Sequence, residues 1–323
     1  MQHRLIRLPL DSERVVDADE EVFILYSKST PSSSEHRGLG YVDSRRDILN
    51  LSFELKGNPT TAVSKSKRKL ASQEKTIDVQ LAQDKTALRS RSGDTGSVVW
   101  RASIDFAQLV LQQAHAKSLD SVFDPGRLAL SRVLELGSGT GLLSIALSPL
   151  VAHYAATDIQ DLLPLIRKNL ALNFPGWPHV PSKQGTPALG HNISVEELNW
   201  ETLHSTPPSR RAQLFPPPSA PWDLVLIVDC IYHPALLPSL LATIDYVATS
   251  ELTTVVVAVE LRAEDVIRDF LEQWLSLGGG EWEVWRVGND KVTEGILAID
   301  KPYVMWVGWK GGVGVIPENQ MSL

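Results

Sequence analysis

Cysteine is nearly absent from this sequence, because Cys230 is the single one in 323 residues. One cysteine forms neither an intramolecular disulfide nor a thiolate metal cluster, so we expect a reducing compartment and no metal site. Long apolar runs are also missing: none approaches the ~20 residues of a membrane-spanning helix, and the N-terminus lacks the apolar core of a secretion signal. We therefore expect a cytoplasmic monomer without membrane contact.

Positive charge is scarce as well. The chain has 31 Lys and Arg against 38 Asp and Glu, which gives a formal net charge of -7. This balance argues against broad, charge-driven binding to nucleic acid, although a local basic face remains open. With 43% hydrophobic residues, the chain is long enough for one large domain, or for one domain with an appendage.

The most informative stretch is a glycine-rich loop between a short apolar strand and a helix. The strand covers 132–136, the loop 137–141 reads Gly-Ser-Gly-Thr-Gly, and apolar residues recur at helical spacing from Leu142. Glycine permits positive φ and lets a ligand approach the backbone, while the helix directs its amide end at the loop. The pattern predicts the opening unit of a nucleotide-binding α/β sheet.

The spacing of the glycines distinguishes between nucleotides. A dinucleotide site needs a third glycine or alanine three positions after the second, where this chain has Leu142. Glu135 near the strand end, followed by Gly-x-Gly-x-Gly, resembles the first motif of the class I methyltransferases, whose ligand is S-adenosylmethionine. A purely structural glycine turn stays open as an alternative.

A second acidic residue follows the next strand. Asp158 ends the apolar run 155–157 and lies about twenty residues beyond Gly137, a distance at which a βαβ unit places a carboxylate opposite the loop. There it would accept hydrogen bonds from both ribose hydroxyls. The alternative is that Asp158 caps the helix predicted at 161–173.

The remainder of the chain alternates between strand and helix patterns, as in a doubly wound α/β sheet. Strands are predicted at 193–200, 224–228 and 254–261, helices at 104–115, 235–247 and 263–275, and a closing antiparallel pair at 282–287 and 303–309. The fully apolar strand 224–228 delivers Asp229 and Tyr232 to the carboxyl edge of the sheet, where ligands of such folds bind.

The first 92 residues do not fit this alternation and predict a small β appendage. Its strand-like runs lie at 22–26, 48–55 and 77–81. The polar, basic stretch at about 58–75 is interpreted as a mobile insertion, with contact to RNA-rich surroundings as the alternative. The methyltransferase domain would then cover 93–323.

Five features in order resemble the seven-β-strand protein lysine methyltransferases: Trp100, the motif at 135–141, Asp158, Trp200 and Asp-x-x-Tyr at 229–232. In its N-terminal part the chain is also similar to the fungal ribosomal lysine methyltransferase 5 group. The similar features are the segment 45–48, the basic insertion and Leu-Arg-Ser at 88–90. The resemblance implies a seven-stranded Rossmann-like sheet and methylation of a lysine in a large-subunit ribosomal protein, with S-adenosylmethionine as the cofactor.

The resemblance also implies which residues bind the cofactor. They are Trp100, Glu135, Gly137, Ser138, Gly139, Asp158, Trp200 and Val228. The loop amides would take the methionine carboxylate, and Trp200 would stack on the adenine. Family members commonly have a small residue in the place of Val228. Either tryptophan could instead be an ordinary core residue.

Methylation of a lysine requires its neutral amine, which is rare at neutral pH because the free side chain has a pKa of ~10.4. A narrow aromatic channel would desolvate the ammonium group and lower that pKa. The resemblance places Asp229 and Tyr232 at such a channel as catalytic residues. Asp229 would orient the amine or accept its proton through water, and Tyr232 would form the wall, unless it only packs on the next helix.

Three other function classes stay open. The first is a methyltransferase acting on nucleic acid or a small molecule. Those that act on bases usually carry Pro-Pro and an aromatic residue after the fourth strand, whereas Cys230 and Ile231 occupy those places here. A non-catalytic binding module is disfavoured by the intact loop and Asp158. An oxidoreductase is disfavoured by the glycine spacing.

Overall fold

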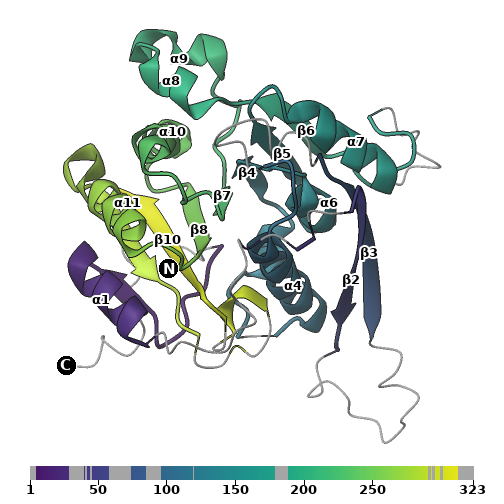
Figure 1. Ribbon diagram of the computed structural model, residues 1–323, viewed down its shortest axis with the longest axis horizontal. Helices are drawn as coiled ribbons and strands as arrows, with labels where there is room; N and C mark the ends of the chain where they lie inside the picture. Colours follow the sequence, from purple (N-terminus) through teal and green to yellow (C-terminus); the bar gives the residue numbers. More distant parts are fainter. Residues whose placement is uncertain are drawn as a thin grey trace, which may run out of the picture.

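The computed structural model describes residues 5–28, 40, 42–43, 46–57, 74–84, 96–118, 120–178, 188–289, 292, 295–298 and 301–311. In this part of the chain, helices cover both faces of a central eight-stranded sheet (Figure 1). A separate two-stranded sheet lies beside it. The arrangement confirms the predicted doubly wound α/β fold.

The central sheet has the strand order β1-β9-β10-β8-β7-β4-β5-β6. The strands are β1 (Glu13–Val15), β4 (Arg132–Leu136), β5 (His153–Asp158), β6 (Ile193–Glu197), β7 (Leu224–Val228), β8 (Thr254–Glu260), β9 (Trp282–Arg286) and β10 (Tyr303–Lys310). Strands β4 to β8 pair in parallel, while β10 is antiparallel to both β8 and β9. The sequence predicts seven of these strands; β1, antiparallel to β9, adds an eighth at the edge.

Two apolar cores flank the sheet because its central strands are buried on both faces. In β7, Leu226 packs into one core and Ile227 into the other. The first core lies under α4 (Arg101–Ala116), α6 (Leu142–Leu147) and α7 (Leu163–Asn173). The second lies under α1 (Ala18–Lys28), α8 (Trp200–Ser205), α10 (Leu237–Val247) and α11 (Glu264–Ser276). The shorter helices are α5 (Pro125–Leu128), α9 (Pro208–Leu214), η3 (Ser148–Leu150), η4 (Pro234–Leu236), η5 (Leu277–Gly279) and η6 (Gly295–Leu297).

The two-stranded sheet consists of β2 (Ile48–Leu55) and β3 (Lys75–Ala82), as the sequence predicts at 48–55 and 77–81. Side chains of α7 satisfy the outer edge of β3. Asn169 accepts from the Ala82 amide at 2.7 Å and donates to its carbonyl at 3.0 Å, and Asn173 binds both backbone groups of Gln80. Most of the basic stretch and the proposed boundary near residue 92 lie outside the described residues.

The predicted strand at 22–26 is wrong, because these residues belong to α1. A short apolar run suits either a strand or a helix, and the preceding residues favour the helix. Asp17 accepts from the Glu20 amide at 2.8 Å, and the first turn of the helix is acidic. Ala18 and Val22, four residues apart, are then buried together.

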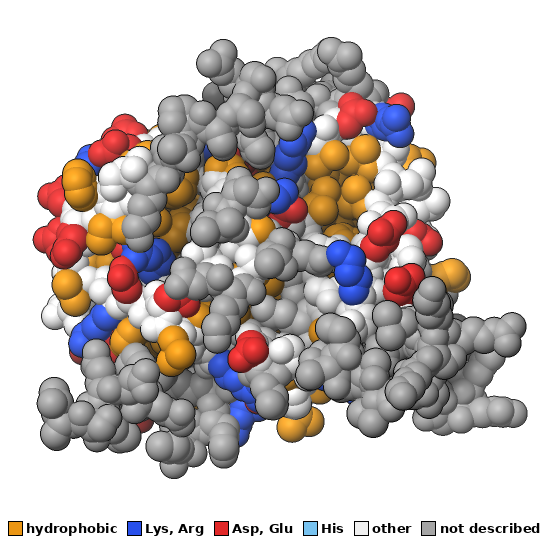
Figure 2. Space-filling model, turned by 90° about the horizontal axis from the view of Figure 1, so that it is seen from below, with side chains coloured by type: hydrophobic (Ala, Val, Ile, Leu, Met, Phe, Trp, Pro, Cys, Tyr) orange, Lys and Arg blue, Asp and Glu red, His pale blue; other side chains and the backbone are white. Residues whose placement is uncertain are grey.

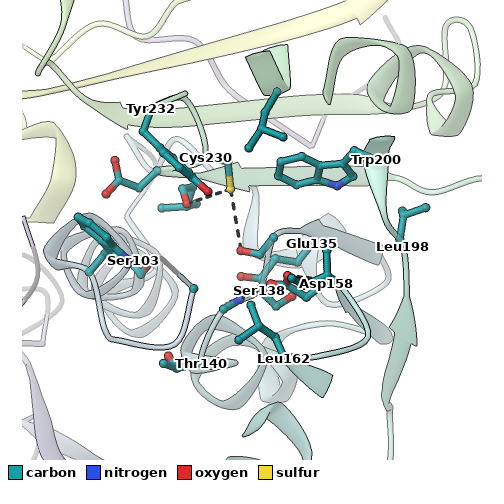
Figure 3. Close-up of a pocket in the computed structure, with 18 of the residues that line it drawn as sticks. Ser103, Glu135, Ser138, Thr140, Asp158, Leu162, Leu198, Trp200, Cys230 and Tyr232 are labelled. Atoms are coloured by element: carbon teal, nitrogen blue, oxygen red, sulfur yellow. Dashed lines mark hydrogen bonds between the residues drawn. The ribbon is translucent and has the colours of Figure 1, made fainter. Parts of the chain in front are cut away.

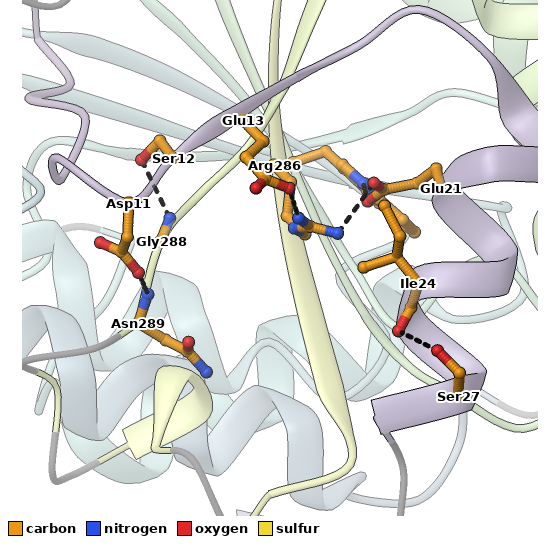
Figure 4. Close-up of polar contacts among 10 residues, drawn as sticks. Asp11, Ser12, Glu13, Glu21, Ile24, Ser27, Arg286, Gly288 and Asn289 are labelled. Atoms are coloured by element: carbon orange, nitrogen blue, oxygen red, sulfur yellow. Dashed lines mark hydrogen bonds and ion pairs between the residues drawn. The ribbon is translucent and has the colours of Figure 1, made fainter.

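The N-terminal segment is fastened to β9 by polar contacts (Figure 4). Ser12 Oγ accepts from the Gly288 amide at 2.9 Å, and Arg286 forms ion pairs with Glu13 and with the buried Glu21. Glu21 also accepts from the indole of Trp306 at 2.9 Å. These bonds pair a carboxylate that would be costly to bury alone, so β1 and α1 are integral to this edge of the sheet.

Acidic side chains gather along one edge of the lower face in Figure 2, on the side where Figure 1 places α1 and α11. Arg268 of α11 lies among them and pairs with Asp19 and Glu264, each at 2.7 Å. Such exposed pairs add little stability. Among the described helices, none combines the length and the apolar content that crossing a bilayer requires.

Candidate active site

A cavity of about 480 Å³ opens at the carboxyl ends of the parallel strands. Its volume lies in the range of small-molecule and cofactor sites. All ten sequence-predicted site residues line it: Trp100, Glu135, Gly137, Ser138, Gly139, Asp158, Trp200, Val228, Asp229 and Tyr232. Figure 3 shows Trp200 and Asp158 at one end of the cavity and Tyr232 at the other.

The glycine loop forms one wall, and the lack of side chains there is required by close packing. A Cβ at Gly137 would lie 2.7 Å from Cys230 Sγ, and one at Gly139 would lie 2.9 Å from the Gly96 carbonyl oxygen. Both glycines also have positive φ, 75° and 54°. Gly96 precedes Trp100, so the loop is packed against the segment that leads into α4.

The backbone amides of this loop have partners on β5. The amides of Gly137 and Ser138 both donate to the Thr157 carbonyl at 3.0 Å, and the amide of Gly139 donates to Asp158 Oδ2 at 2.7 Å. A ligand carboxylate would therefore compete with these bonds. These bonds hold the loop against the end of β5.

Asp158 ends β5 and lines the cavity with 9% of its surface exposed. Its Oδ1 accepts from the Ile159 amide at 2.8 Å. The alternative role as a helix cap is not observed, because the N-cap residue of α7 is Leu162 and no side chain caps that helix. The carboxylate instead connects the glycine loop to the strand end.

Glu135 is buried at the base of the cavity, with 3% of its surface exposed. The hydroxyl of Tyr154 donates to its Oε2 at 3.0 Å. Burial, with a smaller contribution from the nearby charge of Asp158, raises the pKa of Glu135 to about 7, while the bond from Tyr154 opposes the shift. A carboxyl in this state gains by meeting a cationic group.

Trp200 begins α8, whereas the sequence predicts it at the end of a strand. Asn199 ends the extended segment early by capping the helix, since its Oδ1 accepts from the Thr202 amide at 3.0 Å. The indole ring lies against the glycine loop, 3.2 Å from the place of a Cβ on Gly137. Its buried Nε1 has no hydrogen-bond partner among the described residues. A bound ligand with an aromatic face and an acceptor atom would fit here.

The other end of the cavity contains an ion pair. Asp229 follows β7 with φ of 61°, a conformation that only a few non-glycine residues adopt. Its amide donates to the Ala258 carbonyl at 2.8 Å, and its two oxygens accept from Arg262 at 2.9 and 2.7 Å. The guanidinium carbon of Arg262 lies 4.9 Å from the ring centre of Trp100. Trp100 thus both lines the cavity and stacks on a cation.

Residues 80–275 match the model of a family described as lysine methyltransferase. The chain belongs to the lysine methyltransferase family. This assignment confirms the predicted lysine methyltransferase family, whose members are methyltransferases, with S-adenosylmethionine as the cofactor. The closely packed glycines of the loop and the unpaired indole nitrogen of Trp200 fit such a cofactor.

Three similar proteins show what this chain resembles and how much of their length it covers. The chain is 30% identical to a diaminohydroxyphosphoribosylamino-pyrimidine deaminase of Schizosaccharomyces pombe, covering 80% of this chain and 51% of that protein. It is 24% identical to ribosomal lysine N-methyltransferase 5 of Zygosaccharomyces rouxii, covering 82% and 90%. It is 29% identical to protein-lysine methyltransferase METTL21E of Bos taurus, covering 56% and 54%. The chain thus spans about half the length of the first and third proteins.

Several cavity residues of this lysine methyltransferase family member are absent from the sequence prediction. They include Gly96, Ser103, Asp161, Leu162, Cys230 and His233. Cys230 donates to the Leu136 carbonyl at 3.4 Å, and burial raises the pKa of its thiol well above the usual range, so it acts as a filler beside Gly137. In the described ranges no group of three or more His, Cys, Asp or Glu residues is arranged to hold a metal ion.

Proposed function

We propose that this chain is an S-adenosylmethionine-dependent protein-lysine N-methyltransferase that acts on a lysine of a large-subunit ribosomal protein. The observation that carries the proposal is a single cavity with two chemically different ends. A polar end, with Asp158 and the glycine loop, suits the cofactor, and an aromatic end, with Trp100 and Tyr232, suits an amine. The relative whose length this chain covers to 90% is named a ribosomal lysine N-methyltransferase.

At the polar end, each proposed role follows from a contact. Asp158, which lines the cavity, would accept bonds from ribose hydroxyls, and the ring of Trp200 would offer a face for adenine. Glu135 would meet the cationic amino group of the methionine part, because a positive group would stabilise the charged form of a carboxyl whose pKa is raised by burial. Val228 closes the cavity floor beside Asp229.

At the aromatic end, the residues would present a neutral amine. The bound cofactor supplies an electrophilic methyl group, which an amine lone pair can attack. Trp100 and Tyr232 exclude water around the lysine and thereby lower the pKa of its ammonium group. Asp229, next to both, would fix the direction of the amine, and alignment of reacting atoms accounts for much of such a barrier reduction.

The wider organisation is part of the same proposal. Within residues 1–92, β1 and α1 join the edge of the central sheet, so only the part around β2 and β3 would form an appendage on the methyltransferase domain of residues 93–323. The appendage contributes the β2–β3 sheet, which packs against α4 and α7. We further propose that the enzyme works as a cytoplasmic monomer.

The test uses tritiated S-adenosylmethionine and the purified protein. Extracts from cells with and without its gene, each with and without ribosomes, are incubated and separated by gel electrophoresis. One labelled protein band is expected, in ribosomal extracts of cells that lack the gene, because their target lysine is unmethylated. Label in RNA or in small molecules would contradict the proposal, as would NAD binding tighter than S-adenosylmethionine in calorimetry.

A further inference from the structure

We propose that Arg262 is a positioning residue of the acceptor end of the cavity, holding Asp229 and Trp100 in one arrangement. The inference rests on the proposed function of the cavity and deepens it. It assigns Asp229 to orientation of the amine and withdraws it from proton transfer. Arg262 is not among the residues that line the cavity, and we assign it no contact with the cofactor or the amine.

The ion pair between Arg262 and Asp229 has a well-defined geometry. Arg262 donates to both oxygens of Asp229, at 2.9 and 2.7 Å, and the carboxylate side chain is only 2% exposed. Two charge-assisted bonds in a fork fix the carboxylate in one plane. The remaining bond to the Asp229 carboxylate, which the Glu260 amide donates to Oδ1 at 3.4 Å, is long. A carboxylate committed to a guanidinium in this way is a poor acceptor for a substrate proton.

Three separate parts of the chain meet at Arg262. Asp229 follows β7, Trp100 precedes α4, and Gly40 belongs to the N-terminal segment. The guanidinium lies 4.9 Å from the ring centre of Trp100, a cation–π distance. The carbonyl of Gly40 accepts from the Arg101 amide at 2.9 Å, and a Cβ on Gly40 would collide with Arg262. Arg262 therefore connects the first turn of α4 to the turn that carries Asp229.

The backbone conformation of Asp229 also depends on its surroundings. With φ of 61°, its backbone occupies a region that costs energy for a non-glycine residue and persists only where the surroundings enforce it. The amide bond to Ala258 and the bidentate pair with Arg262 supply that enforcement. Loss of Arg262 would release both the side chain and the backbone of this turn.

The chain offers a matched control in Arg268. Like Arg262, it pairs with two carboxylates, Asp19 and Glu264, at 2.7 Å each. Its partners, on α1 and α11, have exposed side chains, and Arg268 does not line the cavity. Arg268→Met thus removes an arginine with two partners and leaves the acceptor end intact.

The experiment compares Arg262→Met, Arg262→Lys and Arg268→Met in the full chain. Hydrogen exchange followed by mass spectrometry reports on peptides covering 96–106 and 229–236. Calorimetry gives the affinity for S-adenosylmethionine, and kcat and KM are measured with large-subunit ribosomal proteins from cells lacking the gene. Arg262→Met should speed exchange in both peptides and lower kcat about tenfold or more, with cofactor affinity changed by less than about threefold.

Arg262→Lys keeps the charge and should restore slow exchange only in part, because it forms neither the fork nor the stack. Arg268→Met should change neither peptide and neither kinetic constant. Unchanged exchange in Arg262→Met, or an equal kcat loss in Arg268→Met, overturns the inference. If Arg262→Met does not fold, the graded effect of Arg262→Lys decides. An inactive parent would refute the proposed function, while the exchange data would still decide the positioning role.

Discussion

Replacement of Glu135 by Gln tests the electrostatics of the cavity. The amide keeps the shape of the side chain and an oxygen that can accept from the Tyr154 hydroxyl, but it removes the titrating charge. Burial raises the pKa of Glu135 from an ordinary 4.5 to about 7 in the folded protein. The folded state therefore binds this proton more tightly than the unfolded chain does.

The sign of the effect follows from linkage. Between about pH 4.5 and about pH 7, the folded parent holds more protons at this site than the unfolded chain, so its free energy of unfolding falls as the pH rises. A pKa difference of about 2.5 at 1.36 kcal/mol per unit corresponds to roughly 3 kcal/mol, fully lost above pH 7. The Glu135→Gln variant has no titrating carboxyl at this position, so it does not lose this stability as the pH rises.

The assay is urea unfolding of the cofactor-free parent and variant at pH 5 and pH 8. Relative to the parent, Glu135→Gln should gain about 2–3 kcal/mol of stability between the two pH values. The same variant should bind S-adenosylmethionine about tenfold more weakly at pH 8, since the carboxylate that meets the cationic amino group is gone. A stability difference that does not change with pH would refute the raised pKa, and unchanged affinity would refute the cofactor contact.

Three further substitutions address the loop and the acceptor end. Asp158→Ala should weaken S-adenosylmethionine binding by roughly 1.5–3 kcal/mol in calorimetry, and parent-like affinity would remove its ribose role. Gly139→Ala should abolish measurable binding, because a Cβ would lie 2.9 Å from the Gly96 carbonyl at φ of 54°. Asp229→Asn should lower kcat by about tenfold, with a gap to the parent that stays constant from about pH 7 to about pH 9.5. If the difference in kcat between parent and variant instead shrinks as the pH rises and the lysine deprotonates unaided, Asp229 acts as a proton acceptor.

The parts of the fold that sequence predicts are those set by local pattern. The glycine loop, the buried strand before Asp229 and the position of Asp158 are all found where spacing places them. The run at 22–26 fails because five apolar residues fit a strand as well as a helix, and the deciding signal, the Asp17 cap, lies outside the run. Trp200 changes element for a similar reason, since Asn199 caps a helix one residue earlier.

The missing part of the site is long-range. Arg262 lies 33 residues from Asp229 and carries no motif, so its pairing becomes visible only when β7 and β8 lie side by side. The sequence shows Cys230 only in a place where base-acting methyltransferases carry proline, whereas its contact with the glycine loop depends on the approach of two turns. Side chains that act through tertiary contacts leave no periodic signal in the chain.

The most direct test of the account identifies the amino acid that receives the methyl group. Large ribosomal subunits from cells lacking the gene are incubated with the purified protein and tritiated S-adenosylmethionine, and the protein fraction is hydrolysed and separated by chromatography. We expect label in Nε-methylated lysine, and much less of it when Asp158→Ala replaces the parent. Label in methylated arginine or histidine, or in nucleotides of the RNA fraction, would contradict it.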